Sequence, residues 1–485
     1  MNLAALILAA GLGTRMKSDR AKVLHELGGK PLAAYPVELA LSLKAKPVVV
    51  VVGRQAETVS ALLADRYGDA VRTALQKEQL GTGHAVMAAE SALRGFSGTV
   101  AILSGDAPLL ARETVAALVR QTVRRKSPLG ILISTLDDPT GYGRVLRDPS
   151  GRVRRVVEQK DASADELAVR EANMGVYAVQ AKFLFAALKR IGRDNAQGEY
   201  YLPDLVRLAA EAGHEVVAVE APGEETLGVN DRRQLAQLEK ILQRRTNERL
   251  MAAGVTIRDP ETTWIDAGAK IGRDTVIEPF CRIAGESEIG ENCAIGMGSV
   301  IDGARLADNV EVKPYSVLED SRVEAGAILG PFAHLRQGAQ IGAGCHVGNY
   351  VEVKKSALMA GAKANHLSYI GDAVIGARTN VGAGTITCNY DGYDKHRTIV
   401  GDDVLIGSDT QLIAPVSVPD RVVLGAGTSL TGKVEVPPGA LVVTRPAAVV
   451  VPGFRDRLEK RALAAKAEKA RAGKAAPKGK RARKK

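Results

Sequence analysis

The longest regular pattern in the chain is an aliphatic residue that returns at almost every sixth position between residues 265 and 441. From Ile265 the phrases are IDAGAK, IGRDTV, IEPFCR, IAGESE, IGENCA, IGMGSV and IDGARL, and after short interruptions LGPFAH, LRQGAQ, IGAGCH and VGNYVE. A helix needs apolar residues every three or four positions and a half-buried strand every two, so neither explains this period. A period of six is typical of a parallel β-helix, in which three hexapeptides form one triangular coil. The stretch is therefore predicted to be a β-helix, serving either as a structural spacer or as the support of a site at its interruptions.

The N-terminal region follows another pattern, in which short apolar runs alternate with helical stretches. The runs are ALIL at 5–8, PVVVVVG at 47–53, VAILSGDAPLL at 100–110 and GILIS at 130–134. Such alternation is typical of a doubly wound α/β sheet, which binds ligands at the carboxyl ends of its strands. Between the two regions, LAQLEKILQRRTNERLMAAG carries one apolar stripe that Asn230 or Asp231 can cap. We expect an α/β domain over 1–229, a linker helix over 230–251, a β-helix over 252–454 and a basic tail over 455–485.

Charge changes this picture only at the C-terminus. The net charge is +11, and the segment 460–485 holds twelve Lys or Arg against one acid, so 12 − 1 = +11 lies in this segment. The tail is expected to be disordered or a fraying helix. It is interpreted as a solvated tail, with a tether to nucleic acid or an anionic membrane as the alternative. No obligate nucleic-acid or membrane partner is expected.

Length and apolar runs favour a cytoplasmic, multidomain protein. The chain of 485 residues exceeds what one core usually holds. No apolar run reaches the roughly 20 residues of a membrane span, and the N-terminus lacks a signal-peptide pattern. Three cysteines, Cys281, Cys293 and Cys345, fall at the inward fifth position of a hexapeptide, whereas Cys388 is unexplained by the repeat.

A glycine-rich turn follows the first apolar run. It contains Gly11, Gly13 and Arg15, with Lys22 shortly after it. Such a turn exposes backbone N–H groups to phosphate oxygens, and two cations beside it can hold a triphosphate and a leaving pyrophosphate. The pattern G-x-G-T-R-M followed by a lysine resembles the sugar-phosphate nucleotidyltransferase family. That family usually has proline before the lysine, where this chain has Ala21.

Other candidate groups follow later strands of the same region. Gln76 with Gly81 and Thr82 offers an amide and bare backbone that can read the edge of a base. Asp106 directly follows a strand, where a carboxylate can hold Mg²⁺ or, alternatively, form a turn. Groups suited to sugar hydroxyls are Gly141, Glu158 and Asn173.

The interruptions of the β-helix repeat carry its candidate chemistry. Around them lie His366, Tyr369, Asn380, Asn389, Tyr390 and Lys395. An insertion at 387–397 has no evident packing purpose. An imidazole titrates near neutral pH and can act as a general base, so His366 is a catalytic candidate.

Taken together, residues 1 to about 454 resemble the family of bacterial bifunctional enzymes that make UDP-N-acetylglucosamine. The resemblance implies a Rossmann-like, doubly wound nucleotidyltransferase domain and an all-β left-handed parallel β-helix of hexapeptide repeats. It implies that the β-helix transfers an acetyl group from acetyl-CoA to glucosamine-1-phosphate. The α/β domain would then transfer a uridylyl group from UTP to N-acetylglucosamine-1-phosphate.

For the uridyltransferase half, the resemblance implies catalytic roles for Arg15 and Lys22 and a Mg²⁺ site at Asp106 and Asn230. The residues implied to bind UTP and UDP-N-acetylglucosamine are Leu8, Gly11, Gly13, Arg15, Lys22, Gln76, Gly81, Thr82, Ser104, Asp106, Gly141, Glu158, Asn173 and Asn230. Met174 stands where threonine is usual after that Asn.

For the acetyltransferase half, the resemblance implies His366 as the general base, with Glu352 orienting or charging it. Glucosamine-1-phosphate would be bound by Arg336, Lys354, Tyr369, Asn380 and Lys395. Acetyl-CoA would be bound by Ala383, Asn389, Tyr390, Ser408, Ala426 and Arg445. A homotrimer with acetyl sites shared between chains is also implied.

Two other functions are compatible with the fold. One is a single-activity nucleotidyltransferase whose β-helix oligomerises or regulates, and the other is a non-catalytic scaffold. The first is disfavoured by the presence of His366, Asn389 and Tyr390, and the second by that of Lys22 and Asp106.

Overall fold

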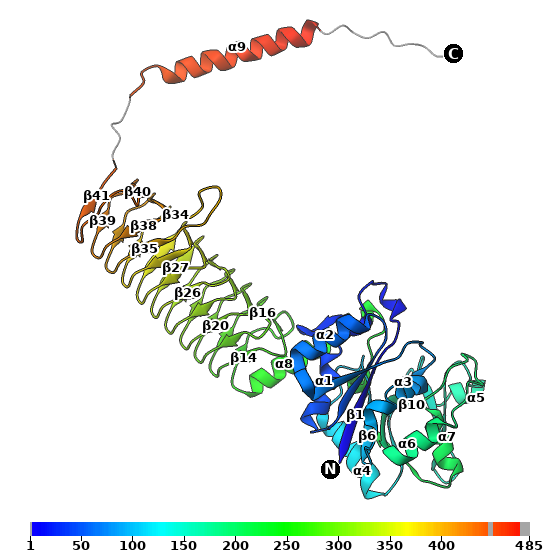
Figure 1. The fold of residues 1–485 in the computed structure, drawn as a ribbon. Coiled ribbons are helices and arrows are strands. Elements are labelled where there is room, and N and C mark those ends of the chain that lie inside the picture. The colour runs from blue at the N-terminus through cyan, green and yellow to red at the C-terminus, as the bar shows by residue number, and fades with distance from the viewer. Residues whose placement is uncertain (1, 445–449, 476–485) are drawn as a thin grey trace, which may run out of the picture.

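Apolar runs that are buried on both faces form the centre of the N-terminal domain. The computed structural model describes residues 2–444 and 450–475, with the side chains of its last helix up to residue 467. In Figure 1 an α/β domain lies at one end, and a long prism of short strands extends from it beyond one connecting helix.

The central sheet has the strand order β11-β7-β10-β6-β1-β4-β5. Its strands are β1 (Leu3–Ala9), β4 (Val48–Val52), β5 (Val71–Leu75), β6 (Thr99–Ser104), β7 (Leu129–Thr135), β10 (Glu171–Gln180) and β11 (Val216–Glu220). Neighbours are parallel except for β10, which runs antiparallel to both β6 and β7. Two further strands, β8 (Gly143–Arg147) and β9 (Val153–Val157), extend from β10 as an antiparallel pair. The predicted doubly wound α/β sheet is confirmed, with one reversed strand that the apolar pattern did not reveal.

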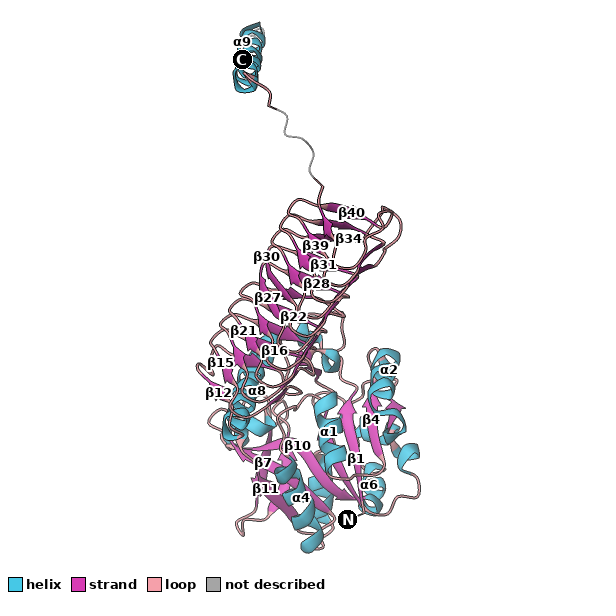
Figure 2. Cartoon of the chain, turned by 90° about the vertical axis from the view of Figure 1, so that its left-hand side faces the viewer, coloured by secondary structure: helices cyan, strands magenta, loops and turns pink. Residues whose placement is uncertain are grey.

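Helices cover both faces of this sheet (Figure 2). They are α1 (Ala34–Ser42), α2 (Ala56–Tyr67), α3 (Thr82–Ala88), α4 (Arg112–Arg124), α5 (Ala164–Leu167), α6 (Ala181–Leu188) and α7 (Asp204–Glu211). Successive strand residues point to opposite faces, so Ala5 and Ile7 join one core with α1, α2 and α4. Ala4 and Leu6 join the other core with α3, α6 and α7.

One long helix, α8 (Arg232–Ala252), connects the sheet domain to the prism. Asp231 caps it, because its side chain accepts hydrogen bonds from the N–H groups of Arg233 and Gln234, both at 2.9 Å. In its C-terminal half, Gln243 Nε2 donates to the carbonyl oxygen of Thr263 at 2.7 Å, and Asn247 Nδ2 donates to the same oxygen at 3.0 Å. The helix is thus fixed to the first coil of the prism through buried amide groups.

The prism is the predicted left-handed parallel β-helix. Three stacked parallel sheets run from β12 (Thr256–Ile257) to β41 (Leu441–Val442), from β13 (Trp264–Ile265) to β40 (Ser429–Thr431), and from β14 (Lys270–Ile271) to β38 (Val416–Val418). From β12 to β37, each strand pairs with the third strand along the chain, as Ile265 does with Ile283 one coil later. The inward aliphatic residues form one continuous core, in which Cys281, Cys293 and Cys345 are also buried.

One coil of the prism is longer than the coil that follows it. Asn380 in β33 (Asn380–Val381) pairs with Leu405 in β36 (Leu405–Ile406), and Leu405 pairs in turn with Val423, which lies fewer positions further along the chain. The additional residues form the insertion loop, residues 389–397, which projects from the prism beside β34 (Ile386–Cys388) in Figure 1.

Exposed aromatic rings line one corner of the prism. Tyr315, Phe332 and Tyr350 occupy equivalent corners of successive coils and stack with ring centroids 5.4 and 5.3 Å apart. We call these three residues the aromatic ladder. Their relative exposures of 51%, 43% and 57% leave a large apolar surface uncovered.

After the prism, residues Phe454–Ala475 form helix α9. Among the described residues, the search for helices that are long and apolar enough to cross a membrane finds none.

Candidate active sites

The glycine-rich turn after β1 is held by contacts from both sides. Gly13 has a left-handed φ of 63°, and a Cβ atom there would lie 2.7 Å from Lys22 Cβ, so only glycine lets the two segments approach. Arg54, just after β4, donates to the carbonyl oxygens of Leu12 and Ser18, both at 3.1 Å. These contacts hold the turn open at the carboxyl edge of the sheet.

Ala21 has its own anchor where the nucleotidyltransferase family usually has proline. Its N–H donates to Gln55 Oε1 at 2.6 Å, a bond that proline cannot make because it lacks the hydrogen. The loop before Lys22 is therefore held by a hydrogen bond instead of by a ring.

Five predicted residues meet where β1 and β6 end side by side. Lys22 forms an ion pair with Asp106, and Ser104 Oγ donates to the other carboxylate oxygen of Asp106 at 2.6 Å. Arg15 Nη2 donates to Asn230 Oδ1 at 2.7 Å. The N–H of Val229 donates to the carbonyl oxygen of Asp106 at 2.9 Å, which places Asn230 beside Asp106.

These donors fit Mg²⁺ in chemistry. The carboxylate of Asp106 and the amide oxygen of Asn230 are hard ligands of the kind that Mg²⁺ prefers. Both oxygens face cationic side chains here, so both lie where a positive charge is stabilised. Among the residues with described side chains, no three His, Cys, Asp or Glu gather as a metal cage. A sparse ligand set suits Mg²⁺, which often binds through one or two carboxylates together with substrate phosphates and water.

The candidate base-reading loop lies beside α3. Gln76 is buried, and its Nε2 donates to the carbonyl oxygen of Gly81 at 3.2 Å and lies 3.1 Å from His84 Nδ1. Thr82 Oγ1 accepts from the N–H of Leu202 at 3.1 Å. The three predicted residues are thus brought together, and His84 is a neighbour that the sequence analysis missed.

The candidate sugar-binding residues lie on β8, β9 and β10. Asn173 pairs with Gly143, and a Cβ atom on Gly143 would lie 3.4 Å from Glu158 Oε1, so Asn173 and Glu158 are close neighbours. Gly141 donates its N–H to Gln159. The pKa of Tyr142 is raised by burial and then by the negative charge of Asp106, so this cluster lies near Asp106.

Two side chains of this cluster have informative surroundings. Burial, and then the charges of Asp161, Glu199 and Asp204, raise the pKa of Glu158. Met174 is buried in the core beneath α1, α2 and α4. Because Asn173 precedes it on the strand and points to the opposite face, the methionine does not take a place among the sugar-binding groups.

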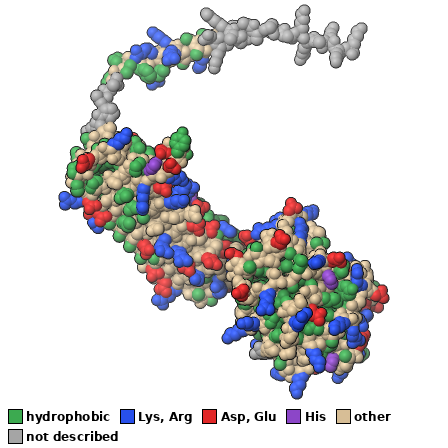
Figure 3. Space-filling model, in the orientation of Figure 1, with side chains coloured by type: hydrophobic (Ala, Val, Ile, Leu, Met, Phe, Trp, Pro, Cys, Tyr) green, Lys and Arg blue, Asp and Glu red, His purple; other side chains and the backbone are tan. Residues whose placement is uncertain are grey.

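Cations gather on the prism beside the insertion loop. The pKa of Lys354 is lowered mainly by Lys395 and then by Arg336, so the three cations lie close together. Figure 3 shows Lys and Arg side chains concentrated next to the projecting loop. Such a cluster is suited to a phosphate group.

His366 and Glu352 have different partners from those expected. The Nδ1 atom of His366 lies 2.9 Å from Oδ1 of Asn349, which precedes it by one coil. Glu352, expected to orient or charge His366, accepts a hydrogen bond from Arg336 Nη1 at 2.7 Å and pairs with Tyr369 across the sheet. Asn349 is therefore the structural partner of the histidine, with its amide oxygen facing Nδ1 and Nε2 directed elsewhere.

The insertion loop is ordered by its own polar contacts. Asp391 accepts hydrogen bonds from the N–H groups of Tyr393 and Asp394, both at 2.8 Å, and lies 2.7 Å from His396 Nε2. Tyr390 and Lys395 form an isolated antiparallel bridge across the loop. At its start, Asn389 Nδ2 donates to Asp372 at 2.5 Å. The insertion was visible in the sequence, but the roles of Asp372, Asp391 and His396 were not.

The predicted acetyl-CoA residues form a column over successive coils. The N–H of Asp409 donates to the carbonyl oxygen of Ala383 at 2.7 Å, and that of Gly427 donates to the carbonyl oxygen of Ser408 at 2.8 Å. Ala426 directly precedes Gly427, so it continues this column. Asn380 lies on the same coil as Ala383. Arg445 lies outside the described residues.

Comparison with known proteins finds relatives that contain both the α/β domain and the β-helix. The family model "Nucleotidyl transferase" matches residues 4–270, "Bacterial transferase hexapeptide (six repeats)" matches 268–303 and "GMPPB C-terminal domain" matches 317–426. "Bifunctional protein GlmU" of Anaeromyxobacter dehalogenans (strain 2CP-C) is 55% identical over 415 residues, covering 85% of each chain. The chain belongs to the GlmU family.

Other GlmU proteins match over a still larger share of the chain. The protein of Anaeromyxobacter sp. (strain Fw109-5) is 54% identical and covers 93% of this chain and 92% of its own. That of Pelobacter propionicus is 50% identical and covers 95% of this chain and 99% of its own. Membership of the GlmU family confirms the predicted bifunctional enzyme of UDP-N-acetylglucosamine synthesis, with acetyltransferase and uridyltransferase activities.

Proposed function

We propose that the cationic cluster around His366 is the acetyltransferase site and that the Arg15, Lys22, Asp106 and Asn230 cluster is the uridyltransferase site. One observation carries this assignment: each half of the chain gathers cations suited to a phosphate around a group suited to its own reaction. The acetylated product of the first site is the substrate of the second.

At the β-helix, His366 Nε2 takes a proton from the amino group of glucosamine-1-phosphate. The nitrogen then attacks the thioester carbonyl of acetyl-CoA, a C–N bond forms, the C–S bond breaks, and coenzyme A leaves as the thiol after taking up a proton. Asn349 holds the imidazole by its Nδ1 hydrogen. Arg336, Lys354 and Lys395 bind the sugar phosphate. Tyr369, Asn380, Asn389 and Tyr390 contact the sugar or the acetyl group, and the Ala383–Ser408–Ala426 column binds acetyl-CoA.

At the α/β domain, a phosphate oxygen of N-acetylglucosamine-1-phosphate attacks the α-phosphorus of UTP. A new P–O bond forms, and the bond from the α-phosphorus to the bridging oxygen breaks to release pyrophosphate. Arg15 and Lys22 neutralise the phosphates beside the open backbone of the glycine-rich turn. Gln76, Gly81 and Thr82 contact the uracil, while Gly141, Glu158 and Asn173 bind the sugar.

Asp106 and Asn230 would hold Mg²⁺ at this second site. The ion supplies charge neutralisation between two anionic reactants. The side-chain oxygens of Asp106 and Asn230 already contact the cationic groups of Lys22 and Arg15. Both oxygens are therefore directed toward positive charge. Chelation by EDTA is therefore expected to stop uridylyl transfer and to leave acetyl transfer active.

We also propose a cytoplasmic homotrimer. The substrates UTP and acetyl-CoA belong to the cytoplasm, and the aromatic ladder offers an exposed apolar strip that another prism can cover. Packing of prisms along this strip brings neighbouring chains close to the column of acetyl-CoA residues.

Two substitutions test the assignment of sites. Lys22→Ala removes a phosphate-neutralising cation and should lower uridylyl transfer by about 100-fold or more, with acetyl transfer unchanged. His366→Ala removes the base and should lower acetyl transfer by about 10²–10⁴-fold, with uridylyl transfer unchanged. The two reactions are followed separately as released coenzyme A thiol and released pyrophosphate. Loss of both activities from either substitution, in a folded protein, would refute the two-site assignment.

A further inference from the structure

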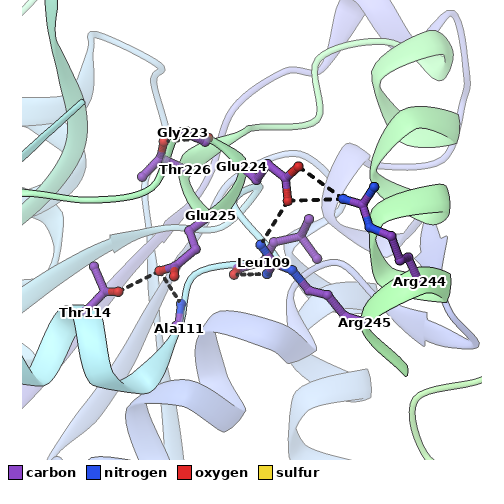
Figure 4. A network of polar contacts seen from close by, with 9 residues as sticks. All are labelled: Leu109, Ala111, Thr114, Gly223, Glu224, Glu225, Thr226, Arg244 and Arg245. Carbon is purple, nitrogen blue, oxygen red and sulfur yellow. Dashed lines mark hydrogen bonds and ion pairs between the residues drawn. The ribbon is translucent and has the colours of Figure 1, made fainter. Parts of the chain in front are cut away.

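A polar network joins the linker helix to the segment that carries Asn230 (Figure 4). Glu224 lies in the short helix η5 (Gly223–Thr226), six positions before Asn230. Its carboxylate accepts a hydrogen bond from Arg244 Nη2 at 3.1 Å and lies 3.6 Å from Arg245 Nη2. Both arginines come from α8, so one carboxylate is shared between two successive side chains of the connector.

Arg245 also reaches the loop that carries Asp106. Its Nη1 donates to the carbonyl oxygen of Leu109 at 3.0 Å, three positions after Asp106. This guanidinium therefore bridges the two segments whose ends supply the two proposed metal ligands. It contacts one segment through Glu224 and the other through a backbone oxygen.

Glu225 fixes the same two segments from the opposite side. Its carboxylate accepts hydrogen bonds from the N–H of Ala111 at 3.1 Å and from Thr114 Oγ1 at 2.6 Å, which caps the start of α4. A carboxylate is favoured at a helix N-terminus by the exposed N–H groups and the helix dipole. The segments 106–111 and 223–230 are thus joined at Glu225, at Arg245 and, nearest the site, by the bond from Val229 to Asp106.

The contacts of Glu224 with the two arginines contribute more to the placement of Asn230 and Asp106 than to the stability of the fold. Glu224 and Arg244 are about half exposed, and exposed ion pairs contribute little to folding because water screens them. Asn230 is also tied directly to the start of α8, since its N–H donates to Gln234 Oε1 at 2.8 Å. The helix that is fixed to the prism by Gln243 and Asn247 therefore also fixes both ligands of the proposed metal site.

We propose that Glu224, Arg244 and Arg245 are positioning residues of uridylyl transfer, which hold Asn230 and Asp106 at the spacing that binds Mg²⁺. We call these three side chains the linker clasp. The clasp makes α8 part of the machinery of the α/β domain as well as its connection to the prism. This inference rests on the proposed function of the Asp106 and Asn230 pair.

The test compares variants of the full-length chain in Mn²⁺ binding with UTP present, measured by electron paramagnetic resonance of free Mn²⁺. Arg245→Met keeps an unbranched apolar side chain but loses the guanidinium and with it both contacts. Arg245→Lys keeps the charge for Glu224 but cannot span both acceptors. Glu224→Gln keeps the volume and loses the charge. The control is Arg249→Met, an exposed arginine of the same helix that forms no ion pair with any of the described side chains.

The expected result is that Arg245→Met weakens Mn²⁺ binding by about tenfold, as loss of groups that orient metal ligands typically does. Glu224→Gln and Arg245→Lys should have intermediate effects, and Arg249→Met none. The Mg²⁺ concentration for half-maximal uridylyl transfer should rise in the same order, with acetyl transfer and the thermal midpoint nearly unchanged.

Equal Mn²⁺ binding by Arg245→Met and the wild-type chain would overturn the proposal that the linker clasp positions the metal ligands. If Arg245→Met also loses acetyl transfer and the thermal midpoint falls, Glu224→Gln decides in its place by the same comparison. A wild-type chain without uridylyl transfer would instead overturn the proposed function itself, so the two failures are distinguishable.

Discussion

At the scale of single residues, Glu158 shows how a binding group can oppose folding. Its carboxylate is partly buried and lies among three other acids, and these causes raise its pKa above the usual value of 4.5. Sugar hydroxyls can donate hydrogen bonds to it in the complex. In the free protein the ionised form is unfavourable, a cost typical of functional sites.

We predict that Glu158→Gln raises the thermal midpoint at neutral pH while it lowers uridylyl transfer. A raised pKa means that the folded chain holds its proton at a pH where the unfolded chain has lost it, so stability is greatest in acid and falls as pH rises through the raised pKa. Glutamine has no such dependence. The gain should therefore be small near pH 4.5 and grow toward pH 8 in scanning calorimetry. A gain of the same size at both pH values would show that titration of Glu158 is not its cause.

Sequence motifs predicted many of the candidate site residues, but the contacts between those residues could not be predicted from the sequence. Arg15, Lys22 and Asp106 lie in loops that follow strands, and neighbouring parallel strands bring such loops together. Asn349 gave no comparable signal, because its link to His366 depends on the two residues standing 17 apart, one coil of the prism. Coil lengths vary with each interruption, so that register is visible only in the folded chain.

At the scale of elements, the insertion loop brings a cation to a site that the regular coil cannot reach. Lys395 lies near Lys354 because Asp391 gathers three donors within a short turn. Hydrogen bonds from Asp394, His396 and Tyr393 lower the pKa of Asp391, so the carboxylate stays ionised and the turn stays closed at neutral pH.

We predict that Asp391→Asn raises the KM for glucosamine-1-phosphate in acetyl transfer by about tenfold, with a smaller change in kcat. The substitution removes the charge from these hydrogen bonds and weakens them, so Lys395 is held less often over the phosphate. Steady-state kinetics at saturating acetyl-CoA measure both constants. Asp394→Asn is the control, because Asp394 takes part through its backbone. An unchanged KM for Asp391→Asn would show that the loop is ordered without this carboxylate.

The elements themselves were predictable to different degrees. A period of six can be satisfied only by coils that repeat, so the β-helix was evident from Ile265 onward. The reversed direction of β10 was not, because an apolar run buried on both faces looks the same in parallel and antiparallel strands. The choice of Asp231 over Asn230 as the cap of α8 likewise depends on which side chain turns toward the helix.

At the scale of the whole molecule, assembly through the aromatic ladder is expected to affect the two activities differently. Acetyl transfer is proposed to need neighbouring chains, whereas the residues proposed for uridylyl transfer lie together within one chain. Phe332 stands at a corner with a φ of 55°, which aspartate tolerates, and Asp409 occupies the equivalent corner of a later coil.

We predict that Phe332→Asp converts a trimer to monomers, because it places a charge in the middle of the apolar strip. Sedimentation velocity should show the smaller species, with acetyl transfer lost and uridylyl transfer retained. A trimer that persists with full acetyl transfer would place the interface on another face of the prism.

We predict that the basic tail is dispensable for both reactions. Truncation after Glu459 removes all the net positive charge of the chain but no residue proposed for either site. Both specific activities and the thermal midpoint should be unchanged. If the tail is a tether, binding to DNA or anionic vesicles should disappear with it and, in the full chain, weaken steeply with salt. Loss of acetyl transfer on truncation would instead assign the tail to the acetyl-CoA site.

The stacking of the prism also sets how far a metabolite must travel. Six steps along one sheet lead from β12 to β30, the strand that ends at His366, which corresponds to a rise of roughly 30 Å at the usual spacing between strands. For the two proposed sites, the acetylated sugar phosphate would therefore have to leave one and diffuse to the other. A coil contacts mainly its neighbours, and Ile283 pairs with Ile301, so the segment 283–300 is one complete coil. Its removal would shorten that path by one strand spacing and leave the chemistry at both ends intact.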